Sequence, residues 1–493
     1  MLPHSIRSIV GTMSLMVTMA SAGFAHNPID SLLQTLPATC TQFMQQRGWP
    51  SLSIAIVRDQ KIVYSQAFGD ADVEKKIPAT TRTIYRVGSI TKLFSATMLM
   101  QLAERGKVNL SDPLRKYIPT YTPKYPDNGG PTTLRQLATH TAGLHVDAGQ
   151  GFWHYFSNFQ WVVTKGQEQI FWGITKNDLL STLDKVEIEY TPNTFPHYSN
   201  FGYQLLGMAL EKAAGEPFEE YITSNILKPL SMDNSGFSLD QEQQSRFAVG
   251  YTYLEPDFHR YRAPEWDLTL LKYSGGLYST PEDIARFIAF QFRDCKQGNP
   301  SVLSGDGVRL MRTPQTLRDP QSGDTYGIGW ALYEYAGHGV IAHAGGHWGF
   351  AAKAEVLPDL KFGVVVMTNC NYPQGDLGPD KDLTRIIIDE FLPLLQKAKN
   401  ESPFDLRSVR LQKYSGQFSI PGGYARADVY VRNDTLRFRL AEKPQFDVPL
   451  LPVAVHQFCF AVDLGRHPMF TFGADDAGNI VSVEFLTYRF IKK

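Results

Sequence analysis

The residues Ser89-Ile90-Thr91-Lys92 combine a hydroxyl group and an amine at a spacing of three positions. On a helix, residues three apart lie on one face, so the two side chains come within reach of each other. An unprotonated lysine can then take the serine proton, which makes the oxygen a nucleophile toward a carbonyl carbon. The lysine loses its own proton only where desolvation or a nearby positive charge disfavours its charged form. Serine and lysine at this spacing also arise by chance, so the motif alone is weak evidence.

A second candidate is Tyr198-Ser199-Asn200. A phenol hydroxyl can relay a proton to a leaving group, and a carboxamide can hydrogen-bond both a catalytic amine and a substrate. A loop tyrosine followed by an asparagine that caps a helix would have the same sequence. The pattern alone therefore leaves a catalytic and a structural interpretation open.

A third candidate is His343-Ala344-Gly345-Gly346. Glycines in a strand let the backbone approach a ligand closely. An ordinary glycine-rich turn would have the same composition, so this motif also has two interpretations.

Predicted secondary structure positions these candidates. Residues 52–57 and 62–65 predict a β-hairpin, and residues 351–357 and 362–367 predict a second one late in the chain. Residues 89–105 have apolar side chains at helical spacing and precede Gly106, so Ser89 lies at the start of a helix. A further helix begins around Pro281, with acidic residues in its first turn. Strands early and late therefore flank a middle of helices and loops.

The three motifs occur at positions 89, 198 and 343, together with two further segments, residues 133–144 and 274–280. In type and order they resemble the superfamily of class C serine β-lactamases, DD-peptidases and related esterases, whose nucleophile motif is Ser-x-x-Lys. The resemblance covers roughly residues 50–396. It implies a mixed α/β fold of the β-lactamase and transpeptidase type, in which an antiparallel sheet is flanked by helices beside an all-helical region.

The resemblance also implies roles for individual residues. Ser89 would be the nucleophile, Lys92 and Tyr198 the proton-transfer pair, and Asn200 a positioning group. The backbone N–H groups of Ser89 and Gly346 would form the oxyanion hole, aimed at the carbonyl oxygen as it gains charge.

His343, Gly345 and Gly346 would contribute to substrate binding, and His343 departs from the family pattern. β-Lactamases of the family usually have lysine there, and a neutral imidazole holds a carboxylate more weakly than an ammonium does. β-Lactamase activity is therefore possible but less favoured than cleavage of peptide, amide or ester bonds. We expect a serine hydrolase that forms an acyl-enzyme on Ser89 with a small-molecule or peptide substrate. The alternative is a non-catalytic peptidoglycan- or penicillin-binding sensor of the same fold.

Composition and missing motifs exclude other classes. The 48 Lys and Arg residues balance 49 Asp and Glu residues, so nucleic-acid binding is not expected. His140 and His145 lack the third ligand that a zinc site needs, so we expect a structural role for them. The sequence contains neither a Gly-x-Ser-x-Gly motif nor a phosphate-binding Gly-Lys-Ser/Thr loop. We therefore expect neither a metal nor an organic cofactor.

Residues 1–25 predict a signal peptide, because Arg7 precedes apolar residues 9–19 and small residues suit cleavage after Ala22 or Ala25. The apolar stretch is shorter than the roughly 20 residues that a membrane-spanning helix needs. We expect a periplasmic or secreted protein with no stable membrane span after cleavage. The four cysteines have no metal-type spacing, and their disulfide pairing stays open: Cys40, Cys295, Cys370 and Cys459.

Residues 26–400 form the predicted hydrolase domain, and a polar stretch at residues 397–403 marks its end. Beyond it, short strands and turns predict a small all-β, barrel-like domain over residues 404–493. Eight aromatic residues gather in residues 151–173. They predict either a satellite core or a cover over the acyl-binding cleft.

Overall fold

The computed structural model describes residues 28–124, 130–146, 169–171, 179–180, 183, 186–254, 259–267, 271–292, 302–316, 325–371, 382–401, 411–419, 426–432, 435–454, 457–460, 469–475, 479–485 and 488–492. The predicted signal peptide lies outside these residues, as does all of the aromatic segment 151–173 except residues 169–171. The structure therefore tests neither prediction.

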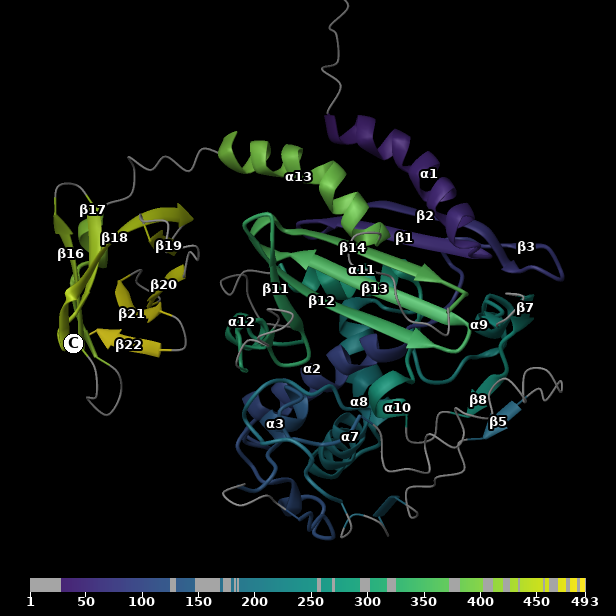
Figure 1. Ribbon diagram of the computed structural model, residues 1–493, viewed down its shortest axis with the longest axis horizontal. Coiled ribbons are helices and arrows are strands. Elements are labelled where there is room, and N and C mark those ends of the chain that lie inside the picture. The colour runs from purple at the N-terminus through teal and green to yellow at the C-terminus, as the bar shows by residue number, and fades with distance from the viewer. Residues whose placement is uncertain are drawn as a thin grey trace, which may run out of the picture.

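Within the described residues, an eight-stranded antiparallel sheet has the order β10-β11-β12-β13-β14-β1-β2-β3 (Figure 1). The first predicted hairpin is β1 (Ser51–Arg58) and β2 (Lys61–Asp72), and the late one is β13 (Phe350–Leu357) and β14 (Phe362–Thr368). Because β1 pairs with β14, the two hairpins share one sheet. The other strands are β3 (Ile77–Pro78), β10 (Thr325–Tyr326), β11 (Ala331–Tyr335) and β12 (His338–His347).

Helices cover both faces of this sheet. Helices α1 (Pro28–Arg47) and α13 (Leu383–Glu401) pack on one face, and their core side chains include Leu36 and Phe391 (Figure 1). On the opposite face, α11 (Pro281–Phe290) packs against α2 (Thr91–Glu104) through the rings of Phe287 and Phe94. Since both faces are covered, β1 and β14 are buried along nearly their whole length, which explains why most of their residues are apolar.

A mainly helical region packs around α2 beside the sheet (Figure 1). Its α-helices are α3 (Leu134–Ala138), α7 (Asn200–Ala214), α8 (Phe218–Ile222), α10 (Lys272–Gly275) and α12 (Gly305–Met311). The short helix α9 (Gln241–Ser245) lies outside this group (Figure 1). The shorter helical turns of the region are η1 (Gly88–Ile90), η2 (Leu114–Lys116), η4 (Thr223–Leu227) and η5 (Lys228–Leu230). Elsewhere, η6 (Pro358–Leu360) joins β13 to β14, and η9 (Leu411–Tyr414) packs in the C-terminal domain. Small strand pairs join β4 (Tyr85–Arg86) to β9 (Tyr278–Ser279), β5 (Gln169–Phe171) to β8 (Glu265–Asp267), and β6 (Tyr251–Leu254) to β7 (His259–Arg262).

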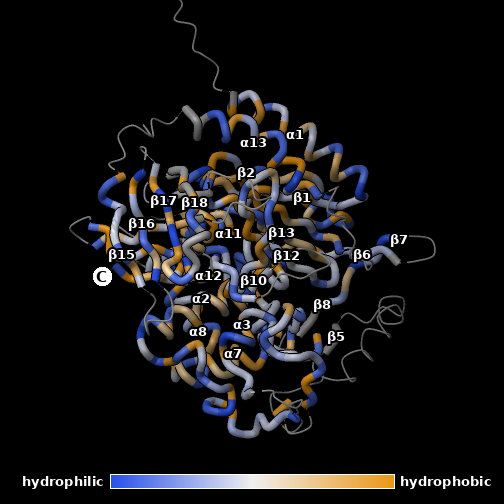
Figure 2. Tube along the Cα trace, turned by 60° about the vertical axis from the view of Figure 1, so that its left-hand side comes forward, coloured by the Kyte–Doolittle hydropathy of each residue, from blue (hydrophilic) through white to orange (hydrophobic). Residues whose placement is uncertain are grey.

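The C-terminal strands form a closed antiparallel barrel, in which the last strand pairs with the first. Its strands are β15 (Gly416–Ser419), β16 (Arg426–Arg432), β17 (Thr435–Leu440), β18 (Lys443–Ala454), β19 (Gln457–Phe460), β20 (Met469–Ala474), β21 (Ile480–Phe485) and β22 (Tyr488–Lys492). Buried aromatic side chains such as Phe438, Phe470 and Phe490 give it a core of its own. In Figure 2, strands β16 and β17 carry both apolar and polar residues, and buried side chains alternate with more exposed ones along them, as a two-sided strand requires.

The predicted fold class is confirmed: a mixed α/β structure with an antiparallel sheet, a helical region and a separate all-β domain. The boundary between residues 400 and 404 stays a prediction, because residues 402–410 are not described. Among the described helices, none combines the length and the apolar character that crossing a membrane would take. Cys40 and Cys370 are buried free thiols, and burial raises the pKa of each to about 12.

Candidate active site

Ser89 lies in the turn η1, between strand β4 and helix α2, and is half-buried. The predicted helix therefore begins as a single 3-10 turn and continues as α-helix from Thr91. Gly88 has a φ of +50°, in the left-handed region that glycine adopts without a steric penalty. A β-carbon on Gly88 would lie 2.8 Å from the backbone nitrogen of Gly346. The turn that carries Ser89 is thus in direct backbone contact with strand β12.

Lys92 lies one turn further along, with a fully buried side chain. Its Nζ donates hydrogen bonds to Ser89 Oγ at 3.0 Å, to Asn200 Oδ1 at 2.7 Å and to the backbone carbonyl of Ser274 at 3.0 Å. The same nitrogen lies 4.8 Å from the ring centroid of Tyr198. The three hydrogen bonds hold Nζ in one position, facing the serine hydroxyl. An ammonium donates in all three, whereas the uncharged amine donates in two of them and can accept the serine proton in the third.

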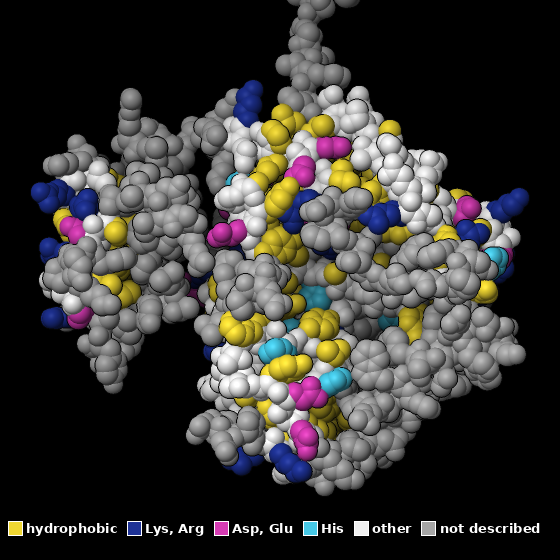
Figure 3. All heavy atoms as spheres, in the orientation of Figure 1, with side chains coloured by type: hydrophobic (Ala, Val, Ile, Leu, Met, Phe, Trp, Pro, Cys, Tyr) yellow, Lys and Arg dark blue, Asp and Glu magenta, His cyan; other side chains and the backbone are white. Residues whose placement is uncertain are grey.

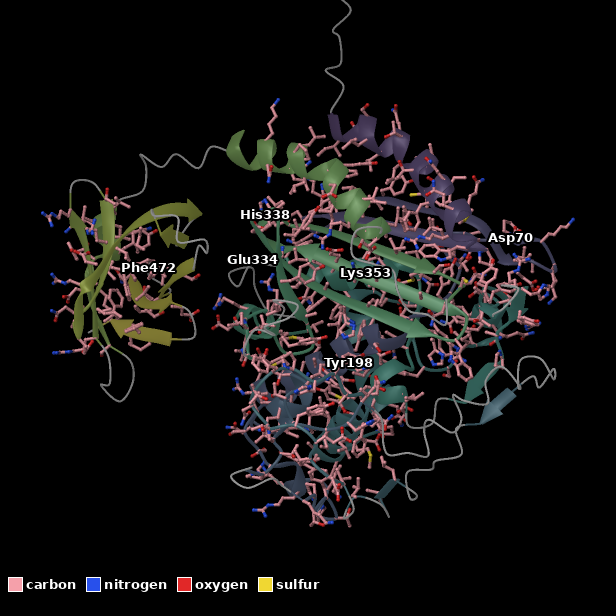
Figure 4. The ribbon with its side chains drawn as sticks, in the orientation of Figure 1. Asp70, Tyr198, Glu334, His338, Lys353 and Phe472 are labelled. Carbon is pink, nitrogen blue, oxygen red and sulfur yellow. The ribbon has the colours of Figure 1, made fainter. Side chains whose placement is uncertain are left out.

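Tyr198 lies just before α7, and Asn200 is the first residue of that helix. Ser199 is the N-cap of this helix, since its side chain accepts a hydrogen bond from the backbone N–H of Gly202 at 2.8 Å. The capping role therefore falls to Ser199, and the carboxamide of Asn200 contacts Lys92 instead. In Figure 4, Tyr198 lies between the sheet and the helical region. The structure thus brings the second motif against the first.

His140 holds this segment in place, through a specific contact that the sequence analysis did not identify. Nδ1 of His140 accepts a hydrogen bond from the backbone N–H of Ser199 at 3.1 Å, and the ring centroid lies 4.5 Å from that of Tyr198. Burial, and then the charge of Lys92, hold the pKa of the His140 imidazole well below its usual value. The ring therefore stays neutral and keeps its Nδ1 lone pair. The sequence did point to this region, because residues 133–144 are one of the segments that carry the family resemblance. The resemblance did not, however, assign a contact to the histidine within them.

The third motif lies within strand β12 and not in a turn. A β-carbon on Gly345 would lie 2.9 Å from the backbone nitrogen of Ser89. The predicted oxyanion donors, the N–H groups of Ser89 and Gly346, thus belong to two backbone segments in contact. Two donors can meet one carbonyl oxygen only in such an arrangement.

His343 precedes these glycines on the same strand and is 5% exposed. Its Nδ1 lies 2.7 Å from the carbonyl oxygen of Ala344, and a carbonyl only accepts, so Nδ1 carries the proton. Burial, and then the charge of Lys92, lower the pKa of the His343 imidazole to about 3. The side chain is therefore neutral near pH 7. It brings no positive charge to the position at which β-lactamases of the resembling family usually have a lysine.

Figure 3 shows histidine side chains along the boundary between the sheet and the helical region. Within the part of the chain that the structure describes, no three histidine, cysteine or carboxylate side chains form a group able to hold a metal ion. The reactive groups that the described residues bring together are instead the Ser89 hydroxyl, the Lys92 amine, the Tyr198 phenol, the Asn200 carboxamide and backbone N–H groups.

The fold and the grouping of these side chains match what the sequence resemblance implied, and the comparison with known families identifies the family. The model of the family described as Beta-lactamase matches residues 36–387, which contain all three motifs and more than half of the chain. The chain belongs to the Beta-lactamase family, whose members are generally serine hydrolases.

Two curated relatives are distant. The protein called Protein flp of Staphylococcus aureus (strain N315) is 25% identical over 335 residues, which cover 66% of this chain and 61% of that protein. The chain thus matches about three fifths of the length of this relative. The human protein named Putative beta-lactamase-like 1 is 27% identical over 391 residues, which cover 75% of this chain and 70% of that protein.

Two solved structures share the fold. The octameric penicillin-binding protein homologue from Pyrococcus abyssi is 27% identical, with a TM-score of 0.61, and the match covers 93% of this chain and 100% of that one. The beta-lactamase/D-alanine carboxypeptidase from Pseudomonas syringae is 20% identical, with a TM-score of 0.57, and the match covers 74% of this chain and 98% of that one. The predicted β-lactamase-type fold is therefore confirmed.

Proposed function

We propose that this protein hydrolyses peptide, amide or ester bonds through an acyl-enzyme on Ser89. The single observation that carries the proposal is the position of Lys92 Nζ, which lies 3.0 Å from Ser89 Oγ while Asn200 Oδ1 holds it from another side at 2.7 Å. A buried amine fixed against a half-exposed hydroxyl is what a serine nucleophile needs for activation.

In the acylation half of the reaction, Ser89 Oγ forms a bond to the substrate carbonyl carbon, and its proton passes to Lys92 Nζ in the unprotonated form. The carbonyl oxygen becomes an oxyanion that the N–H groups of Ser89 and Gly346 stabilise. The bond to the leaving group then breaks. The proton on Lys92 reaches the leaving atom through the hydroxyl of Tyr198, which gives one proton and receives another.

Deacylation repeats these steps with water. The water oxygen attacks the acyl carbon, its proton passes to Lys92 through Tyr198, and the bond between the acyl carbon and Ser89 Oγ breaks. Ser89 regains a proton from Lys92, and the acid product leaves. Each proton released in one half of the reaction is returned in the other, so no further reactant is required.

The substrate and the compartment are also proposals. A neutral His343 favours substrates that do not depend on a cation at that position, which supports peptides, amides or esters over β-lactams with a carboxylate. The N-terminal pattern of residues 1–25 supports export to the periplasm or the exterior.

Turnover separates this function from the non-catalytic alternative. The purified protein would be offered four classes of substrate: a D-amino-acid peptide, a peptidoglycan stem peptide, a β-lactam and a small ester. The proposal requires steady release of product from at least one class, and its loss in the Lys92→Ala variant. Stoichiometric acylation with no release from any class would instead favour a penicillin-binding sensor.

A further inference from the structure

The His343 ring presents a bare hydrogen-bond acceptor inside the site. Nδ1 donates its proton to the carbonyl oxygen of Ala344 at 2.7 Å, so Nε2 of the neutral ring has a lone pair and no hydrogen. Nε2 is buried and finds no hydrogen-bond partner among the described residues. A buried acceptor without a donor is costly, so such a group in a site points to a ligand that supplies one.

The position of His343 on β12 indicates which part of a substrate its side chain would contact. His343 and Gly345 lie on the same face of the strand, two residues and about 7 Å apart. Gly345 contacts the backbone of Ser89, where the reacting carbonyl would lie. The ring centroid of His343 is 6.5 Å from that of Tyr198, the residue proposed to protonate the leaving atom. His343 therefore faces the leaving group and not the acyl group.

The charges around His343 limit the kind of donor. A carboxylate has only acceptors, so its oxygens would meet the Nε2 lone pair with no proton between them. A cation is disfavoured as well, because the charge of Lys92 acts on this ring and already opposes its protonation. A neutral N–H or O–H group satisfies Nε2 without adding charge to the buried site.

We propose that Nε2 of His343 accepts a hydrogen bond from the leaving group, and that the site selects esters or amides whose leaving group carries a neutral N–H or O–H donor over those that carry a carboxylate there. This inference rests on the proposed hydrolase function. It makes His343 a specificity-determining residue.

Three acetate esters of glycolic acid derivatives test it: the N-methylamide, which has one N–H donor, the N,N-dimethylamide, which has none, and the free carboxylate. Acetate release by proton NMR gives kcat/KM, and protection of Ser89 from a fluorophosphonate gives relative binding when turnover is slow. Because the N-methylamide makes one neutral hydrogen bond that the dimethylamide cannot make, we predict that its kcat/KM is about tenfold higher. The carboxylate should rank last.

Two variants assign the preference to His343. His343→Leu removes the acceptor, and the two amides should become equal. His343→Lys introduces a cation, and the carboxylate should become the preferred ester. If the His343→Lys variant does not fold, as judged by circular dichroism, the His343→Leu variant still tests whether the preference between the two amides depends on His343. The matched control is His338→Gln, at the first position of β12, where the ring binds Asp359 and the ranking should not change.

The inference is overturned if the wild-type chain prefers the carboxylate, treats all three esters alike or binds none of them. It is also overturned if the His343→Leu variant keeps the tenfold preference. Labelling of Ser89 by the fluorophosphonate reports separately on the hydrolase function. Labelled Ser89 with the wrong ranking rejects only the inference, whereas unlabelled Ser89 rejects the function on which it rests.

Discussion

A β-carbon on Gly345 would lie 1.9 Å from the carbonyl oxygen of Val87, much closer than two such atoms can approach. Val87 directly precedes the turn that carries Ser89, so strand β12 and the nucleophile turn are in contact through their backbones. Any side chain at position 345 must push the two apart. The oxyanion hole proposed between Ser89 and Gly346 depends on that contact.

The Gly345→Ala variant should therefore lose acylation, because the two N–H donors would no longer point at one oxygen. Loss of one such donor elsewhere costs about 100- to 1,000-fold in kcat. The rate constant for fluorophosphonate labelling measures the effect. Gly339→Ala is the matched control on the same strand, since no atom lies within 4 Å of its β-carbon position. Equal labelling of both variants would contradict the proposed oxyanion hole.

His140→Ala should reduce both stability and labelling, because the buried N–H of Ser199 loses its acceptor. The expected loss of unfolding free energy is about 1–3 kcal/mol, measured by urea denaturation. His140 has a φ of +59°, a conformation that asparagine tolerates, so His140→Asn should recover part of the loss through its side-chain oxygen. A His140→Ala variant that labels as fast as the wild type would show that Tyr198 and Asn200 are held by other contacts.

Acid should destabilise the protein through its buried neutral histidines. The pKa of His343 is about 3 in the folded state and about 6.5 when exposed, so between these values only the unfolded chain binds a proton there. Stability is therefore lost as the pH falls from 6.5 toward 3, by about 2 kcal/mol per such histidine between pH 7 and pH 5. Urea denaturation at the two pH values should show a smaller loss in His343→Gln. The same substitution at exposed His259 should leave the loss unchanged, and an equal effect of both would refute this explanation.

A chain that ends at Ser402 should still label at Ser89 at a rate close to that of the full chain. The barrel has its own core, separate from the two cores that pack against the sheet, and none of the three motifs lies in it. Circular dichroism would establish that the shortened chain folds. If it folds and fails to label, the barrel contributes to the site.

The sequence predicted the elements whose patterns are local. The run of buried apolar residues in β1 and β14, the proline at the start of α11 and the helical spacing after Ser89 each follow from a few neighbouring residues. In the C-terminal domain, strands exist at each place where the sequence predicts one, residues 429–431, 436–438, 458–460, 469–472 and 481–485, but β15, β18 and β22 were missed. Barrel closure depends on pairing β15 with β22, a contact between segments far apart in the chain, which no local pattern reveals.

The candidate site divides in the same way. The motifs at Ser89, Tyr198 and His343 were found by residue type and order, and the structure places them together. The bond from Ser199 to His140 could not be predicted, because it joins a backbone N–H to a ring 59 positions away. The protonation of His343 likewise depends on burial and on the neighbouring Lys92, which only the fold determines.

The most direct test of the central claim is the intact mass of the protein after reaction with a fluorophosphonate, followed by peptide mapping. We predict one adduct per chain, located on Ser89, and no adduct at a comparable rate on the Ser89→Ala variant. An adduct on any other residue, or a Ser89→Ala variant that reacts as fast as the wild type, would contradict the assignment of Ser89 as the nucleophile.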